Sequence, residues 1–254
     1  RPMTEKPNTL VTPSELLENA RTGGERAYVL LREDIITGAL PPGQKLKIEM
    51  LKSRYNLSVG PLREAMSRLS AEYLILQEGQ RGFRVAPLSA EDAREIGELR
   101  LLVEAEALGR SIPAGDTAWE EKIITTFYRL EQVETGNARG PDVMAQWDGL
   151  NKAFHDALVA ACDSKWLLRT RETMFRHHER YRRLSRAKTK MTRNVHAEHK
   201  ALMKAAMDRD VGEAVRLIRM HVEKTTSAVA KALGQAKITT KDAKDIRGRF
   251  DVGR

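Results

Sequence analysis

Apolar residues recur every three to four positions from Glu25 onward, which predicts a helix that ends at Gly38. After a proline-rich turn, residues 48–55 show the same spacing and predict a second, shorter helix. A third helix is predicted to open at Ser58, whose side chain can cap the first turn. Pro61 then falls where a missing N–H costs little. Each helix has one apolar face, so the three are expected to pack on a shared core.

Two short apolar segments follow the third helix and predict a β-hairpin. Residues 74–77 and 83–85 are strand-like, and the loop between them, Glu78 to Gly82, holds two glycines and an arginine. Three helices followed by a hairpin are typical of a winged helix-turn-helix. In that fold the third helix and the hairpin loop approach duplex DNA.

The chain from residue 89 to residue 233 shows only helical spacing. Capped starts and breakers divide it into six predicted helices, at roughly 90–110, 116–136, 141–162, 165–187, 191–208 and 211–233. The predicted fold class is therefore mainly α, with an N-terminal winged helix-turn-helix and a C-terminal all-helical bundle. The predicted divisions are a flexible arm, a winged helix, a helical domain for effector binding and dimerisation, and a flexible basic tail, at 1–24, 25–88, 89–233 and 234–254.

Composition excludes some classes of protein without identifying one. A hydrophobic content of 41% in 254 residues is enough for one or two ordinary cores. The single cysteine, Cys162, excludes an intrachain disulfide and favours a reducing, cytoplasmic location. No apolar run is long enough for a transmembrane helix, and the first residues lack the apolar segment of a signal peptide. No membrane partner is therefore expected.

The net charge of +9 favours a nucleic-acid partner, but its distribution weakens that inference. Residues 1–88 carry a net charge of only +3, residues 89–162 carry −7, and residues 163–254 carry +13. Most of the positive excess therefore lies outside the segment expected to bind DNA. Motif residues, rather than bulk charge, must support the DNA-binding prediction.

Residues 28–85 resemble the winged helix of the GntR family of regulators. The matching residues are Ile35-Ile36-Thr37-Gly38-Ala39-Leu40-Pro41-Pro42-Gly43, Ser58, Glu64-Ala65 and Arg81-Gly82-Phe83-Arg84-Val85. Taken alone, the Ser-x-x-Pro-x-Arg start of the third helix also fits an ordinary helix with a solvated arginine. Because the match covers the whole module, DNA binding is the expected function of this segment.

The resemblance implies which residues meet DNA. The helix after Ser58 would enter the major groove, with Arg63 on a phosphate or a guanine edge, while the wing tip would reach the minor groove. Most family members have an arginine directly after the Ser58 position, whereas this chain has Val59, so an atypical operator sequence is expected. The complete implied set is Lys47, Ser58, Gly60, Pro61, Arg63, Gln80, Arg81 and Gly82.

All six histidines of the chain lie between residues 155 and 221. Asn151 and His155 are four residues apart and share one helix face. A turn near residue 210 can bring His199 and His221 to one layer of a bundle. Histidine is the commonest transition-metal ligand, but hydrogen-bonded core histidines would give the same pattern. The residues alone leave both interpretations open.

Residues 90–233 resemble the helical ligand-binding domain of the FadR subfamily, the FCD domain. Its metal-binding members use one aspartate and three histidines, and His155, His199 and His221 match the histidine positions. Asn151 occupies the aspartate position. The resemblance implies a divalent transition metal, zinc or nickel, held by the three histidines with Asn151 as a weak fourth ligand. A carboxylate effector would take the remaining coordination positions.

Charged residues of the helical half are candidates for effector binding. Arg100 and Glu104 match an Arg-x-x-x-Glu position of the subfamily, although such a pair is also common on helix surfaces. Arg176 and Arg180 belong to a cationic helix that either holds an organic acid or forms a solvated face. At Ala153-Phe154-His155 and Arg180-Tyr181-Arg182 the chain also resembles the carbon-starvation-induced regulators. This resemblance implies a C4–C5 dicarboxylate effector.

The expected function is that of a sequence-specific transcriptional regulator and not of an enzyme: a repressor that a small organic acid releases from a double-stranded operator. A homodimer is expected because one short helix reads too few bases. Two alternatives stay open. A metal-dependent enzyme would need a motif such as His-Glu-x-x-His, which the sequence lacks. A nonspecific architectural protein would use the basic tail and bind all duplexes equally.

Overall fold

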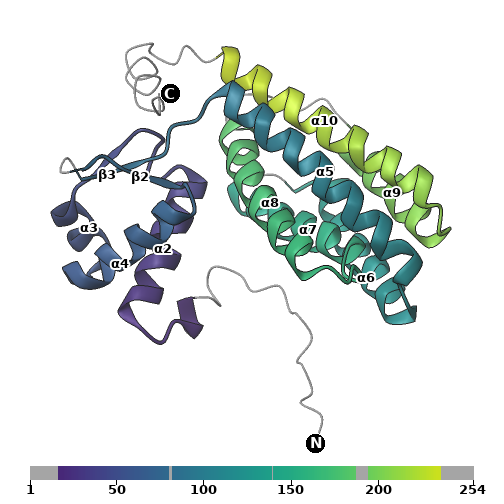
Figure 1. The fold of residues 1–254 in the computed structure, drawn as a ribbon, viewed down its shortest axis with the longest axis horizontal. Helices are drawn as coiled ribbons and strands as arrows, with labels where there is room; N and C mark the ends of the chain where they lie inside the picture. Colours follow the sequence, from purple (N-terminus) through teal and green to yellow (C-terminus); the bar gives the residue numbers. More distant parts are fainter. Residues whose placement is uncertain (1–16, 80–81, 139, 187–193, 236–254) are drawn as a thin grey trace, which may run out of the picture.

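The computed structural model describes residues 17–79, 82–138, 140–186 and 194–235 (Figure 1). Two groups of elements follow each other along the chain. Figure 1 shows an N-terminal lobe of short helices with a small sheet beside an elongated bundle of longer helices. A stretch without helix or strand, residues 86–89, joins the two lobes. The predicted mainly α fold, a winged helix-turn-helix followed by a helical bundle, is confirmed.

The N-terminal lobe contains α2 (Gly23–Thr37), α3 (Ile48–Tyr55) and α4 (Val59–Ala71). The first of these begins two residues before the predicted start, because Thr22 and Glu25 form a capping box that satisfies backbone donors at the helix end. It ends where predicted, at Gly38, which has a φ of 85°. The bounds of α3 agree with the prediction.

A three-stranded antiparallel sheet completes this lobe. It comprises β1 (Lys45–Leu46), β2 (Ile75–Gln77) and β3 (Phe83–Val85) in the order β1-β3-β2. The hairpin of β2 and β3 was predicted, whereas β1 was not, because two residues are too few to show a strand period. The lobe closes on an apolar core that includes Leu31, Ile35, Leu51, Leu62, Met66, Leu69 and Val85.

The second lobe consists of six helices: α5 (Ala90–Ala114), α6 (Thr117–Thr135), α7 (Pro141–Leu158), α8 (Lys165–Arg186), α9 (Val195–Met207) and α10 (Val211–Gln235). As predicted, the Ser89 side chain caps α5 by accepting a hydrogen bond from the Asp92 amide at 2.9 Å. The helices α5 and α10 pack so closely that a Cβ on Gly97 would lie 2.4 Å from the Thr226 side chain. Glycine is therefore required at that crossing.

The bundle has its own apolar core, separate from that of the N-terminal lobe, with members such as Trp119, Phe127, Phe154, Leu202 and Val222. Within the described residues, no helix is both long and apolar enough to cross a membrane. Side chains of α8 reach across to the N-terminal lobe. Arg180 donates to the Ala86 carbonyl in the joining segment, and Arg183 donates to Glu33 of α2 at 3.4 Å. The bundle therefore holds the N-terminal lobe through α8.

Candidate functional site

The first turn of α4 presents its polar groups to the outside of the N-terminal lobe. Arg63 is exposed, and its neighbours Leu62, Ala65 and Met66 point into the core. Ser58 holds the N-cap position but makes no side-chain capping hydrogen bond, which corrects the expectation that its hydroxyl caps α4. That exposed hydroxyl is not used by the helix end. The start of α4 therefore carries exposed polar side chains that do not contribute to the hydrogen bonding or packing of the lobe.

Gly60 has no packing role that would require a glycine. A Cβ built on it meets nothing within 4 Å, and its backbone is helical. Pro61 faces the start of α2 instead, because a Cβ on Gly23 would lie 3.0 Å from the Pro61 ring. Glycine inside a helix lowers stability by roughly 0.5–1 kcal/mol relative to alanine, and no contact within the lobe requires this cost at Gly60.

Two other cations of this lobe are engaged in contacts within the fold. Arg68 stacks over the Tyr28 ring at 4.1 Å, and Arg84 pairs with Glu78 at 2.9 Å. Lys47, by contrast, is exposed at the start of α3. Gly82 has a φ of 91°, which suits the wing turn, while the predicted contacts Gln80 and Arg81 lie outside the described residues.

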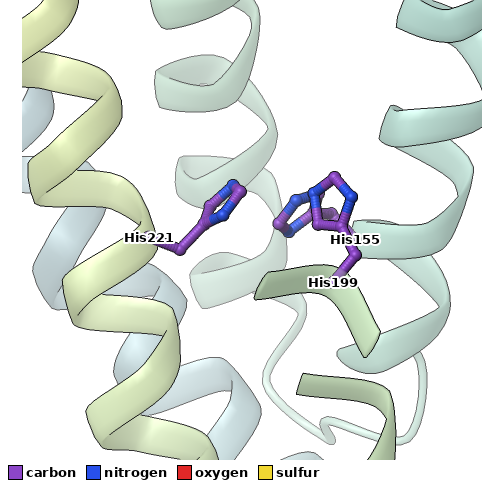
Figure 2. Close-up of side chains that lie close together, drawn as sticks. All are labelled: His155, His199 and His221. Atoms are coloured by element: carbon purple, nitrogen blue, oxygen red, sulfur yellow. The ribbon is translucent and has the colours of Figure 1, made fainter. Parts of the chain in front are cut away.

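His155, His199 and His221 come together inside the bundle (Figure 2). They come from α7, α9 and α10, and all three are buried. One ring nitrogen of each lies within 4.8 Å of the others. The ring centroids are 5.0–5.5 Å apart. This spacing suits three imidazoles around one ion, and it groups the three histidines that the sequence singled out.

Two half-buried carboxylates orient two of these rings from the side away from the centre of the cluster. Glu134 Oε1 lies 2.8 Å from His199 Nδ1, and Glu198 Oε2 lies 3.0 Å from His221 Nδ1. A carboxylate at Nδ1 fixes the tautomer in which the other ring nitrogen, Nε2, keeps a lone pair for a ligand. Sequence reasoning missed both glutamates, since neither is spaced from its histidine in a recognisable motif.

The central atoms of the cluster lack partners within the protein. Among the described residues, both ring nitrogens of His155, the Nε2 of His199 and both amide atoms of Asn151 are buried without a hydrogen bond. Burial, together with His221, His199 and Arg100 nearby, holds the pKa of His155 well below 6.5, so its ring is neutral at pH 7. Unpaired buried polar atoms are unfavourable, and a bound cation would satisfy them. The residue set therefore fits a divalent metal.

A network of buried charges lies beside the histidines. Glu104 accepts from Arg100 at 3.1 Å and from Arg171 at 2.8 Å, and all three are at most 2% exposed. Burial lowers the pKa of Arg100 to about 10, although Glu104 counteracts this. In the part of the chain that the structure describes, the Nη2 atoms of Arg100 and Arg171 have no hydrogen-bond partner. Two unpaired cationic donors in the interior can receive a carboxylate.

The inward face of α8 differs from the one that the sequence suggested. Arg171, Phe175, His178 and Arg182 recur at helical spacing, and Arg100 lies over the Phe175 ring at 4.5 Å and contacts His178 at 3.0 Å. Arg100 and Glu104 lie in the buried network as predicted, whereas the two effector ligands predicted on α8 lie elsewhere. Arg176 pairs with Glu172 on the exposed side, and Arg180 reaches the joining segment. Because α8 carries arginines on every face, the sequence alone could not determine which face points into the bundle.

Family models match most of the chain. Residues 24–85 match the model described as bacterial regulatory proteins, gntR family, and residues 95–224 match the FCD domain. The described histidine cluster falls within the second match.

Two curated proteins show similarity over most of their length. The uncharacterized HTH-type transcriptional regulator BphR of Paraburkholderia xenovorans is 40% identical over 84% of this chain and 87% of that protein. The HTH-type transcriptional repressor GlaR of Escherichia coli is 37% identical over 77% of this chain and 90% of that protein.

A solved structure agrees on the fold alone. The chain is similar to E. coli McbR/YncC with a TM-score of 0.67, at 16% identity, over 84% of this chain and 99% of that one. An arrangement of winged helix and helical bundle is therefore shared at low sequence identity.

Proposed function

The chain belongs to the GntR family of bacterial transcriptional regulators with an FCD domain, and on that basis we propose that it is a repressor whose bundle responds to a small carboxylate. The family consists of regulators rather than enzymes, so a metal-dependent enzyme is set aside. Repression is supported by the similarity to the repressor GlaR. The observation that carries the sensing role is the buried histidine cluster with its unpaired ring nitrogens beside two unpaired arginine donors.

For DNA binding, we propose that α4 enters the major groove with Ser58, Gly60 and Arg63, while Lys47 and the wing contact phosphates and the minor groove. The exposed Arg63 and the bare Gly60 support this assignment. Val59 in place of an arginine supports an operator that differs from the commonest one of the family.

Selection from a random duplex pool tests the operator proposal. The enriched duplex is expected to bind at least about a thousandfold more tightly than a random one at physiological salt. Equal affinity for both, with a steep loss of binding as salt rises, would instead indicate a nonspecific architectural protein.

For the cofactor, the residues that would hold a zinc or nickel ion are His155, His199 and His221, with the Asn151 amide oxygen as a weaker ligand. The ion would supply a positive centre that binds a carboxylate oxygen of the effector. Metal content of the purified protein tests this assignment. His199→Ala is expected to abolish it, whereas His177→Ala, outside the cluster, is the matched control. Fewer than about one ion per five chains, unchanged by His199→Ala, would contradict the proposal.

For the effector, we propose a C4–C5 dicarboxylate bound between the histidine cluster and the unpaired donors of Arg100 and Arg171. The likeness to GlaR, also called CsiR, supports a place among the carbon-starvation-induced regulators. Calorimetric titration of the metal-loaded protein with succinate and glutarate tests it, with butyrate as the control that lacks the second carboxylate. Equal affinity for butyrate would contradict the need for two carboxylates.

We also propose a homodimer, whose interface includes the outer face of α5. Leu99 and Leu102 there are 51% and 59% exposed. Leu102 also lines a largely apolar groove of about 540 Å³, together with Val103, Ala105, Glu106, Gly109, Leu167, Val215 and Arg219. Light scattering of the purified chain should give the mass of two chains, and Leu102→Glu should give that of one. The division into domains at 25–88 and 89–233 also stays a proposal, which the two separate apolar cores support.

A further inference from the structure

A single buried aspartate of α7 touches two consecutive arginines of α8. Asp148 Oδ1 accepts from Arg182 Nη2 at 2.8 Å, and Asp148 Oδ2 lies 2.9 Å from Arg183 Nε. The Asp148 side chain is only 5% exposed. Consecutive helical residues point about 100° apart, so one carboxylate links two side chains that lead to different parts of the molecule.

Arg182 leads toward the histidines. Its guanidinium lies 5.1 Å from the centroid of the Trp147 ring. The indole N–H of Trp147 donates to Glu134 Oε1 at 3.0 Å, and the same oxygen lies 2.8 Å from His199 Nδ1. Every step from His199 to Asp148 is therefore a direct contact between buried or half-buried side chains.

Arg183 leads toward the DNA-reading lobe. Its Nη1 donates to Glu33 of α2 at 3.4 Å, and its Nη2 lies 3.0 Å from Glu179 of α8 itself. The helix α2 packs against α4, which begins at the predicted DNA contacts. A displacement of Arg183 would therefore act on the helix that supports the recognition helix.

We infer that Asp148 is the positioning residue through which the histidine site sets the placement of the DNA-reading lobe. This inference rests on the proposed function, since it requires both a metal at the histidines and an operator at α4. A ligand that attracts Arg182 or displaces Glu134 alters the hydrogen bond between Arg182 and Asp148 Oδ1. The carboxylate then reorients toward or away from Arg183, and with it the link to Glu33. Coupling between two sites requires such a shared element with more than one arrangement.

Asp148→Asn tests the inference because it keeps the shape but removes the negative charge that pairs with both Arg182 and Arg183. The measured quantity is the ratio of operator affinities with and without zinc chloride, by fluorescence anisotropy on full-length protein and a selected duplex. In the unmodified chain zinc is expected to change this affinity by about 5-fold or more. In Asp148→Asn the change is expected to fall below about 2-fold, while zinc affinity and metal-free operator affinity each stay within about 3-fold.

Glu33→Gln should reduce the coupling like Asp148→Asn, and the double variant should lose no more than either single one, since both interrupt one chain of contacts. Glu179→Gln is the matched control. It removes the same kind of charge from the same arginine but bridges no two elements, so the coupling should persist.

Three outcomes would overturn the inference: an undiminished zinc effect in Asp148→Asn, an equal loss in Glu179→Gln, or no zinc effect on operator affinity in the unmodified chain. Zinc binding and operator binding are each measured separately beforehand. Absence of either one refutes the proposed function itself. Thermal unfolding of each variant, together with its unchanged zinc affinity, separates lost coupling from lost folding.

Discussion

The two lobes place their polar chemistry in opposite places. In the N-terminal lobe, every described buried side chain is apolar, and the groups proposed to meet DNA lie on the surface. In the bundle, charged and polar side chains fill part of the interior, including Arg100, Glu104, Asn151 and the three clustered histidines. A surface that reads DNA can thus be altered without touching the core. A buried candidate site instead places the residues proposed for function among those that stabilise the fold.

The difference has a practical consequence for testing function. Variants of the reading surface should change DNA affinity while leaving the free energy of unfolding unchanged. Variants of the buried site should change both, because each buried charge depends on a partner. Only variants with matched controls can separate the two effects in the bundle.

The largest effect on stability is expected when Glu104, which pairs with both Arg100 and Arg171, is neutralised. Glu104→Gln leaves Arg100 buried without a carboxylate partner and leaves Arg171 with Asp156 alone, and it should lower the free energy of unfolding by about 3–5 kcal/mol. Glu106→Gln, which breaks an exposed pair with Arg110, should change it by less than about 0.5 kcal/mol. Urea unfolding at pH 7.5 measures both. Equal effects would mean that burial does not distinguish the two pairs.

The reading surface should show the reverse behaviour. Arg63→Ala is expected to weaken operator binding by about 1–3 kcal/mol, because Arg63 is exposed and proposed to contact DNA. Its unfolding free energy should stay within about 0.5 kcal/mol of the unmodified value. Arg68→Ala, on the same helix, should instead lose mainly the stacking on Tyr28. Anisotropy and urea titrations on both variants decide, and a similar loss of DNA affinity in Arg68→Ala would contradict the assignment.

Acid should destabilise the bundle through His178. Burial, with Arg100 and Arg182 nearby, holds the pKa of His178 well below 6.5, and its ring contacts Arg100 and Thr226. Below about pH 6.5 the unfolded chain binds a proton that the folded chain does not. The free energy of unfolding therefore decreases as the pH is lowered, by up to about 1.4 kcal/mol per pH unit.

His178→Gln removes this titration and retains one acceptor and one donor for Arg100 and Thr226. The variant should therefore lose less stability than the unmodified chain between pH 7.5 and pH 5.5, by urea unfolding at each pH. An identical pH dependence would show that other groups account for the acid sensitivity. The N-terminal lobe contains no histidine and provides an internal reference.

The smallest effect is expected from adding one methyl group at Gly60, which should change stability and DNA binding in opposite directions. Gly60→Ala adds a methyl group into open space on a helix and should raise the free energy of unfolding by about 0.5–1 kcal/mol. The same methyl group should weaken operator binding if the DNA backbone approaches Gly60. Gly97→Ala, where the methyl group would meet Thr226, should be destabilising instead. Unchanged operator affinity in Gly60→Ala would remove Gly60 from the contact surface.

Much of the fold could be predicted from periodicity and capping. The helices of the N-terminal lobe were located to within two residues, because Gly38 and Pro61 act locally on the backbone. The two-residue strand β1 could not be predicted, since it exists only where β3 offers backbone partners. A strand that short is defined by its neighbour rather than by its own residues.

The candidate site divides in the same way. The sequence by itself selected His155, His199, His221 and Asn151, because helical spacing and a family resemblance constrain which residues share a face. It could not select Glu134 or Glu198 as partners of the rings, nor Arg171 and Arg182 over Arg176 and Arg180. Those choices depend on the rotation of α8 and on contacts between residues far apart in the chain. Such contacts are fixed only when the helices pack, and packing is therefore what decides which charges of this protein are buried together.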